Sequence, residues 1–159
     1  MAGLSRNPVV RRRRDGRYEL VLDPDLRRVV RDLLGELDSL LAADPTNADL
    51  TRLRPPAYLE DPDRDAEYQL LAGEELRASR HAAIDTVVLS LDQERLSEDE
   101  LWSWLQALNA LRLVVGTRLD ISEDDHELEV APDHPDAGLW EIYRFTTWLQ
   151  YQVLRALGA

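Results

Sequence analysis

The stretch "LSEDELWSWLQALNALRLVVG", from Leu96 to Gly116, decides the fold that the sequence predicts. Ser97 followed three residues later by Glu100 is the pattern of a capping box, which satisfies free N–H groups at a helix start. Apolar residues then recur at helical spacing and form one stripe: Leu101, Trp104, Leu105, Leu108, Leu111 and Val115. We therefore expect an amphipathic helix, ended by Gly116 because glycine favours the position just past a helix.

Two segments that precede this stretch have the same helical periodicity. In the first, Asp23 can cap a helix that starts at Pro24 and continues to Ala43 with the apolar residues Leu26, Val29, Val30, Leu33, Leu37, Leu40 and Leu41. The second, residues 63 to 91, carries a stripe rich in small residues, which permit close packing: Tyr68, Ala72, Leu76, Ala83 and Val87. Residues 44 to 63 between them hold four of the eight prolines and predict a loop anchored by Leu50, Leu53 and Tyr58.

A last helix is expected over residues 139 to 157, and it is apolar on two sides. One stripe consists of Leu139, Ile142, Thr146, Leu149 and Val153, and the other of Trp140, Tyr143, Thr147, Tyr151 and Leu154. A helix of this kind is either central in its fold or paired with another chain. We expect a homodimer with Trp140, Tyr151 and Leu154 in its interface, and a central position inside one chain is the alternative.

The N-terminal segment "VVRRRRDGRYELVL", Val9 to Leu22, predicts a small β-hairpin. Alternation places Tyr18, Leu20 and Leu22 on one face of a strand, and Asp-Gly at residues 15 and 16 is a strong turn signal. A two-residue loop would set Arg12 opposite Glu19 and Arg14 opposite Arg17. Because the second pair would repel, a longer turn is also open.

These elements predict one domain over residues 1–159, mostly α (an α+β fold), with four helices and the hairpin. Residues 1–22 form a basic arm and hairpin, and residues 23–157 form the helical body. The length suits a single core. No apolar run of signal-peptide or membrane-spanning length occurs, so we expect a cytoplasmic protein without membrane contact.

Charge divides the chain into a basic arm and an acidic body. The net charge is −12, but residues 1 to 17 hold six arginines and one acid, for a local charge of +5, which leaves −17 on the remainder. The candidate residues for binding nucleic acid or a partner are Arg11, Arg12, Arg13, Arg14 and Arg17, which could contact phosphates or an acidic protein. Alternatively, these arginines protect an exposed sheet edge or neutralise the acidic body.

The sequence shows no arrangement that indicates an enzyme, a cofactor or a metal site. There is no cysteine, which excludes disulfides and thiol chemistry, and no nucleophile-elbow or phosphate-loop motif occurs. His126 and His134 lie among carboxylates, but their spacing matches no ligand motif, and a solvated loop is the better interpretation. A helix-turn-helix is also disfavoured, because Glu98, Asp99 and Glu100 would face phosphates.

Two segments resemble signature blocks of a known family. They are "LRPPAYLEDPDRDAEYQLL", Leu53 to Leu71, and "LNALRLVVGTRLDI", Leu108 to Ile121, and they are similar to the actinobacterial oxidative-stress transcriptional regulator family AosR, over about residues 9 to 157. The signature positions are Pro55, Pro56, Tyr58, Glu67, Tyr68, Asn109, Arg112, Gly116 and Arg118. We interpret them as architectural: the prolines fix the loop, the tyrosines cap the core, and Arg112 pairs with Glu67 or Glu141.

The resemblance implies a DNA-associated transcriptional regulator that acts with RNA polymerase or a sigma factor in thiol homeostasis. Members of the family are often encoded beside a Clp protease adaptor, which suggests a protein-binding adaptor of proteolysis, or a structural protein, as alternatives. Redox sensing in the family relies on a cysteine pair, and this chain has no cysteine. The resemblance therefore implies either regulation without a thiol switch or a different role.

Overall fold

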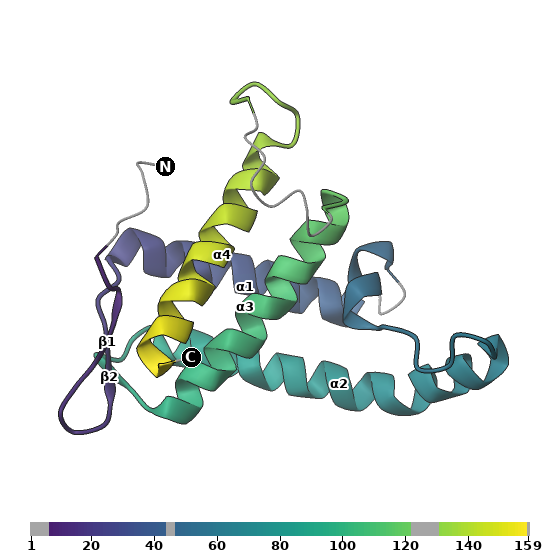
Figure 1. Ribbon diagram of the computed structural model, residues 1–159, viewed down its shortest axis with the longest axis horizontal. Helices are drawn as coiled ribbons and strands as arrows, with labels where there is room; N and C mark the ends of the chain where they lie inside the picture. Colours follow the sequence, from purple (N-terminus) through teal and green to yellow (C-terminus); the bar gives the residue numbers. More distant parts are fainter. Residues whose placement is uncertain (1–6, 44–46, 122–130, 159) are drawn as a thin grey trace.

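The computed structural model describes residues 7–43, 47–121 and 131–158, and it confirms a mostly α fold with a small N-terminal sheet. The elements in chain order are β1 (Val10–Arg12), β2 (Tyr18–Leu20), α1 (Pro24–Ala43), the 3₁₀ helix η1 (Ala48–Leu53), α2 (Pro62–Ser90), β3 (Arg95–Leu96), α3 (Glu98–Arg118) and α4 (Ala137–Leu157). Helix α3 packs against α2, α4 and η1, while α1 packs mainly on α2. The hairpin and the N-terminal half of α2 project from opposite ends of this bundle (Figure 1).

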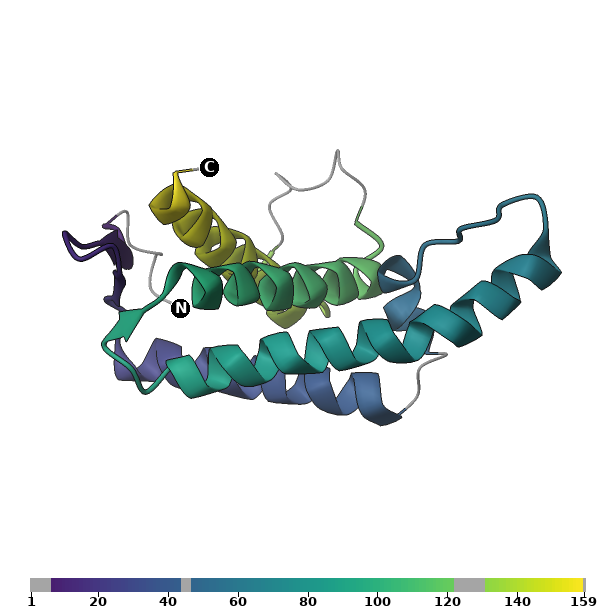
Figure 2. The ribbon, with the colours of Figure 1, turned by 90° about the horizontal axis from the view of Figure 1, so that it is seen from below.

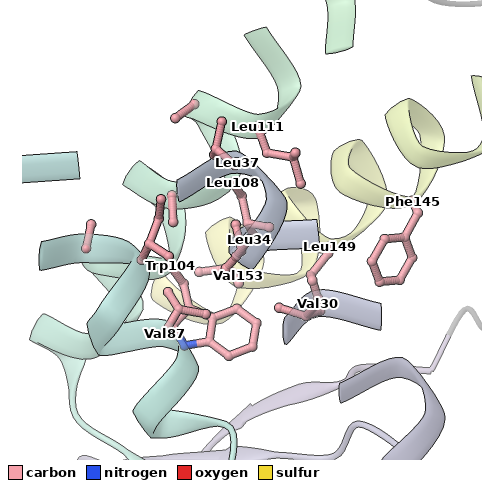
Figure 3. Packing of buried hydrophobic residues seen from close by; sticks show 14 of the residues in the cluster. Val30, Leu34, Leu37, Val87, Trp104, Leu108, Leu111, Phe145, Leu149 and Val153 are labelled. Atoms are coloured by element: carbon pink, nitrogen blue, oxygen red, sulfur yellow. The ribbon is translucent and has the colours of Figure 1, made fainter. Parts of the chain in front are cut away.

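The core forms where the apolar stripes of all four α-helices meet (Figure 3). Trp104 is fully buried, and its indole Nε1 donates a hydrogen bond of 2.8 Å to Ser90 Oγ, which itself donates to the carbonyl of Val87. The buried side chains that share this core with Trp104 come from all four α-helices, namely Val30, Leu34 and Leu37, then Val87, then Leu108 and Leu111, and finally Phe145, Leu149 and Val153. The spacing of apolar residues thus predicted the buried stripe of α3 and most of that of α1, from which the buried Leu34 was missing.

Local signals placed the starts of α1 and α3 correctly. Asp23 Oδ1 accepts from the backbone N of Leu26 at 2.8 Å, and α1 begins at the expected proline. The Ser97 and Glu100 side chains make both hydrogen bonds of the predicted capping box. The expectation that Gly116 ends α3 is wrong, because the helix continues to Arg118 and Gly116 is buried within it.

Gly116 has a steric function in place of the expected terminating one. A Cβ at this position would lie 3.0 Å from Nη1 of Arg52. The guanidinium of Arg52 reaches past the glycine and donates from Nη2 to the carbonyl of Ile121 at 2.6 Å. The missing side chain therefore lets η1 approach α3 closely.

The small-residue stripe predicted along α2 is buried only near its C-terminal end. Ala83 and Val87 are buried, whereas Tyr68 is 40% exposed and Leu76 is 37% exposed. The first half of α2 projects past the ends of the other α-helices, so no described α-helix packs along this part of it (Figure 2). Periodicity identifies the apolar face of a helix, but it does not show how far a neighbouring helix reaches along that face.

The hairpin has a longer turn than the two-residue loop, and the register differs from the expected one. Arg12 pairs with Tyr18 and Arg11 with Glu19, one residue away from the pairing of Arg12 with Glu19. The backbone N of Arg13 donates to the carbonyl of Arg17 at 2.8 Å, and Gly16 adopts a φ of 81° in the left-handed region. This loop keeps Arg14 from facing Arg17 across the ladder. A third strand, β3, pairs with β2 and was not predicted.

The guanidinium of Arg27 joins three parts of the chain. Its Nε donates to the carbonyl of Leu22 at 2.8 Å, its Nη2 to the carbonyl of Leu20 at 2.9 Å, and its Nη1 to the carbonyl of Leu91. Leu20 and Leu22 belong to the end of the hairpin, and Leu91 caps α2. A single side chain of α1 thus connects the sheet to two helices.

We predict that Arg27→Ala lowers the free energy of unfolding by about 1.5–3 kcal/mol, since hydrogen bonds from a charged donor contribute about this much. The matched control is Arg28→Ala, because the neighbouring Arg28 is exposed and makes only a 4.0 Å ion pair with Asp25. Its effect should stay within about 0.5 kcal/mol. Urea unfolding monitored by tryptophan fluorescence measures both, and equal destabilisation of the two variants would contradict the role of Arg27.

His81 of α2 and Asp38 of α1 form a surface ion pair between the two helices. His81 Nδ1 lies 2.8 Å from Asp38 Oδ1. The hydrogen bond to this carboxylate, followed by its charge, raises the pKa of His81 above its ordinary value of 6.5. The protonated imidazole is therefore favoured in the folded protein relative to the unfolded chain.

We predict that His81→Gln destabilises the protein more at about pH 5.5 than at about pH 8.5, because of proton linkage. The folded pKa of His81 is raised, so its stabilising contribution is complete below the unfolded pKa of 6.5 and is lost as the pH rises through the folded value. Urea unfolding of both proteins across this range measures the difference. Asp38→Asn should remove the same pH dependence of stability. If His81→Gln destabilises the protein equally at both pH values, the ion pair does not contribute to the pH dependence.

Candidate functional site

The arginine hairpin, which we define as Arg11, Arg12, Arg13, Arg14 and Arg17, is the candidate binding surface of the chain. All five residues are exposed. Strand β1 lies at the edge of the three-stranded sheet, and the loop after it extends away from the helices (Figure 1). The turn therefore presents the arginines at one end of the molecule, as the sequence predicted for the basic arm.

Few of these arginines are paired with acids of the same chain. Arg13 forms an ion pair with Glu19 on β2. Asp15 at the turn bonds to Arg95 Nη1 at 3.4 Å and accepts from the backbone N of Arg17 at 2.9 Å. Within residues 7–43, 47–121 and 131–158, the side chains of Arg11, Arg12, Arg14 and Arg17 form no ion pair. Most of the positive charge is thus available for an external anion.

The alternative interpretations of the arginines differ in how well they fit this geometry. Neutralisation of the acidic body is supported by one contact of the run, between Arg13 and Glu19. Protection of a sheet edge fits well, because Arg11 and Arg12 lie on the edge strand β1. Edge protection and anion binding use the same exposed guanidinium groups, so both interpretations stay open.

A hollow of about 320 Å³ extends the arginine hairpin toward the C-terminal end of α4. Arg11, Arg12 and Arg155 line it together with Gln152, and no carboxylate of the described residues lines it. The hairpin is fixed here by a hydrogen bond of 3.4 Å from the backbone N of Val9 to Gln152 Oε1. Arg155 and Arg95 were not identified from the sequence, because both are far from the hairpin along the chain and come near it only when the chain is folded. The one local signal for Arg155 was its position as a basic residue in the last turn of a helix.

Two signature positions near the end of α3, Gly116 and Arg118, lie against η1. Arg118 Nε donates to Asp49 Oδ2 at 2.7 Å and so attaches η1 to α3. Gly116 provides the space for Arg52. Asn109 and Pro55 are exposed at the rim of a hollow of about 280 Å³ between α3, α2 and the proline loop. The two signature blocks of the sequence meet at this hollow, which is lined by Leu53 and Pro55 of the first block and by Asn109, Ala110 and Leu113 of the second.

The contacts predicted for Arg112, Tyr58 and Tyr68 differ from those in the structure. Arg112 does not pair with Glu67 or Glu141; its Nε donates to Thr147 Oγ1 at 3.0 Å, and its guanidinium lies 4.9 Å from the ring centroid of Tyr143. Tyr58 and Tyr68 do not cap the core. They pack edge to face against each other at 6.2 Å, with Arg64 over the ring of Tyr58, while Pro56 and Glu67 are exposed.

The residues expected in a dimer interface are divided between the core and the surface. Trp140 is only 9% exposed and packs edge to face on Tyr143, so it belongs to the core of its own chain. Leu154 is half-buried and Tyr151 is 58% exposed. The second apolar stripe of α4 is thus largely covered near its start and leaves Tyr151 and Leu154 for contact with another molecule.

The histidines give no metal site in the described part of the chain. His126 and most of the solvated loop expected around it lie outside the described residues. His134 is exposed, and its Nδ1 accepts from the backbone N of Asp136 at 3.0 Å. Among the residues that the structure describes, no group of three or more histidines and carboxylates could hold a metal ion, and no helix has the length and apolarity needed to cross a membrane.

Comparisons with known proteins agree with the resemblance found in the two sequence blocks. Residues 6–157 match the family described as Domain of unknown function (DUF2017). Relatives named "Oxidative stress regulator AosR", from Mycobacterium tuberculosis (strain H37Rv) and Mycobacterium bovis, are 33% identical over 146 residues, which cover 86% of this chain and 60% of each relative. The chain thus spans about 60% of the length of these curated relatives. No solved structure matches it significantly.

We predict that Gly16→Ala destabilises the protein by about 1–2 kcal/mol, because a side chain at positive φ clashes with its own backbone. Gly16 has a φ of 81°, and a Cβ there would meet no other atom within 4 Å, so the cost is conformational. Gly35→Ala, in an equally open position inside α1, should instead stabilise by up to about 1 kcal/mol. Urea unfolding of both variants tests this, and shifts of the same sign would refute the predicted turn geometry.

Proposed function

Because the chain belongs to the family described as Domain of unknown function (DUF2017), we propose that it is a non-enzymatic regulator of the oxidative-stress response. The names of its relatives carry this role, and their similarity covers 86% of the chain. The family match over residues 6–157 includes the hairpin, α1, the proline loop and α3. The absence of cysteine from the chain means that the proposed regulation proceeds without a thiol switch in this homologue.

The proposed contact is between the arginine hairpin and the phosphates of DNA. The observation that carries this proposal is that Arg11, Arg12, Arg14 and Arg17 are exposed and form no ion pair within the described residues. A guanidinium group offers a planar pair of donors to a phosphate, and each contact releases condensed counterions from the duplex. Phosphate contacts position a protein without reading sequence, so specificity comes from elsewhere in the complex.

The acidic body determines how such a contact could be used. Outside residues 1–17 the chain carries −17, which repels DNA and restricts the contact to the arginine hairpin. A short basic element alone gives weak binding that is sensitive to salt. We therefore propose that RNA polymerase or a sigma factor holds the body, while the hairpin reaches the DNA beside it.

A second candidate function is that of a protein-binding adaptor linked to Clp-type proteolysis. The observation that favours it is a group of exposed apolar side chains around the start of α2, where Leu59 and Leu70 are each 83% exposed and Leu71 is 77% exposed. Apolar side chains exposed together often mark a protein interface. In this role the arginine hairpin would contact an acidic protein surface by the same electrostatics.

A homodimer remains a proposal for the outer face of α4. Tyr151 and Leu154 are available there, while Trp140 is committed to the core. A stable interface buries at least about 1,000 Å². Two side chains supply only a fraction of this area, so the neighbouring surface would have to take part. Light scattering at tens of micromolar decides between a dimer and a monomer.

We predict that replacing Arg11, Arg12 and Arg14 together with alanine weakens DNA binding equally for all sequences. The slope of log affinity against log salt should fall by up to about 0.9 for each phosphate that the variant no longer binds. Fluorescence anisotropy with labelled duplexes at several salt concentrations, with and without RNA polymerase holoenzyme, measures this. The matched control replaces the exposed Arg28, Arg31 and Arg64, removes the same charge and should keep the slope of the original chain.

The same variants distinguish the alternative functions. If the hairpin variant aggregates while its affinity for DNA is unchanged, the arginines protect the edge of β1. If it no longer binds RNA polymerase or another protein and its DNA binding is unaffected, the adaptor is the better proposal. An equal change of slope in the hairpin variant and the control would show that only net charge matters and that the hairpin does not bind the DNA.

A further inference from the structure

A second surface, far from the arginine hairpin, lies along the projecting half of α2 (Figure 2). A groove of about 620 Å³ runs there, and we call it the α2 groove. One wall is the face of α2 between Ala66 and Arg80, and the other contains Leu41 of α1 together with Leu50 and Leu53 of η1. A helix of this length rises about 21 Å, so the groove matches roughly four turns of a second helix.

The α2 groove and its rim expose more apolar surface than a solvated helix needs. Leu70 lines the groove and is 83% exposed, and Leu76 lines it and is 37% exposed. Leu71 and Tyr68, on the neighbouring face of the same helix, are 77% and 40% exposed. Apolar groups gathered in this way on a soluble domain usually mark a binding surface.

The charge of the α2 groove is opposite to that of the chain. Its ionisable residues are Arg54, Arg77, Arg80 and Glu74, which give +2 in a chain of −12. Glu74 pairs with Arg77 at 3.7 Å. Arg80 donates to the carbonyl of Leu53, and partial burial lowers the pKa of its guanidinium. Among the described residues, no carboxylate forms an ion pair with it. An acidic occupant would supply the missing partner.

Arg54 is a second cation in the α2 groove without a carboxylate partner in the described ranges. Its Nη2 donates to the carbonyl of Asn47 at 3.5 Å. Its Nε is buried and has no hydrogen-bond partner among the residues that the structure describes. A buried guanidinium donor without an acceptor is costly, so Arg54 adds an incompletely satisfied cation to the lining of the groove.

Gly73 lies in the lining of the α2 groove, inside the helix. A Cβ at this position would meet no atom within 4 Å. A glycine inside a helix costs about 1 kcal/mol relative to alanine, and packing within this chain does not require it. The uncovered backbone leaves space for another helix to approach closely.

We propose that the α2 groove binds an acidic amphipathic helix of a partner protein. Leucine-like side chains of that helix, at spacings of three and four residues, fill the apolar floor, as in other complexes of a helix and a groove. Its carboxylates pair with Arg54, Arg77 and Arg80. This site adds a protein ligand to the proposed regulator and does not depend on the arginine hairpin.

A second copy of this chain is a poorer occupant. Each copy carries −12, so association is opposed by charge. Helices α1 and α3 already bury their apolar faces in their own core, and the exposed side of α4 at Tyr151 carries Arg155 in place of acids. Helices α1, α3 and α4 thus offer no free acidic amphipathic face to the groove of a second copy.

The test uses the full chain and two labelled synthetic peptides of sixteen residues. Both have leucine at the same helical positions, and the remaining positions are mostly glutamate in one peptide and mostly lysine in the other. Fluorescence anisotropy should show saturable binding of the acidic peptide at least tenfold tighter than that of the basic peptide. No saturable binding of the acidic peptide up to about 1 mM, which corresponds to about −4.1 kcal/mol, would overturn the proposal.

Two pairs of variants locate the binding. Gly73→Trp places a bulky side chain in the α2 groove, at a position where a Cβ meets no atom within 4 Å, and should weaken binding of the acidic peptide at least tenfold. Gly35→Trp, at a position on α1 where a Cβ is equally free of contacts, should not weaken it. Arg77→Glu should lower the ratio of the affinities for the acidic and the basic peptide at least threefold, whereas Arg28→Glu should leave this ratio unchanged. Circular dichroism confirms that each variant is folded. If Gly73→Trp binds the acidic peptide as tightly as the original chain, the α2 groove is not the binding site.

The remaining arms separate other occupants from the proposed one. The variant in which Arg11, Arg12 and Arg14 are replaced with alanine should bind the acidic peptide as the original chain does, so the groove proposal does not depend on the DNA proposal. If this variant does not bind the peptide, the peptide binds to the arginine hairpin and the groove proposal is overturned. A dimer that Gly73→Trp converts to a monomer in sedimentation velocity would identify a second copy as the occupant. Binding to phosphatidylserine vesicles that Gly73→Trp abolishes, without peptide binding, would indicate a lipid surface.

Discussion

Three backbone carbonyls, those of Leu20, Leu22 and Leu91, converge on the guanidinium of Arg27, and the position of the hairpin relative to the helices depends on this convergence. The sheet itself is small, with strands of three, three and two residues, and strands this short have little stability of their own. Its orientation is fixed by Arg27 on one side and by the contact of Val9 with Gln152 on the other. The exposed arginines are thus held at a defined end of the bundle, which turns a run of positive charge into a surface.

The sequence predicted features that arise from neighbours along the chain. The capping box at Ser97, the start of α1 at Pro24 and the buried stripe of α3 all follow from local spacing, and all are confirmed. The failures concern contacts between distant residues: β3 joins β2 from a distant part of the chain, Gly116 is explained by Arg52, and Arg95 reaches Asp15 from 80 positions away. The arginine hairpin could therefore be located from the sequence, whereas its added arginines and the α2 groove required the fold.

The two arginine surfaces lie at opposite ends of the molecule and differ in chemistry (Figure 1). The hairpin offers guanidinium groups in water, and its turn carries no large apolar side chain, which suits a phosphate backbone. The α2 groove places Arg54, Arg77 and Arg80 beside leucines, which suits an amphipathic polypeptide. The body between them is acidic, so a ligand of either surface is repelled by the intervening surface. A chain with this arrangement can bring two different anionic ligands into one complex.

The division of α2 into a packed end and a projecting end also separates two levels of local stability. Its buried residues, Ala83, Ile84, Val87 and Ser90, all lie in the last third of the helix, and the hydrogen bonds of the first two turns are surrounded by solvent. Segments with few buried contacts open at free energies below that of global unfolding. The projecting end is therefore the part of the helix whose fraying and amide exchange respond first to a bound ligand. Helix α2 continues without a break to Ser90, whose hydroxyl donates to the carbonyl of Val87 and accepts from Trp104, so one helix joins the α2 groove to the core.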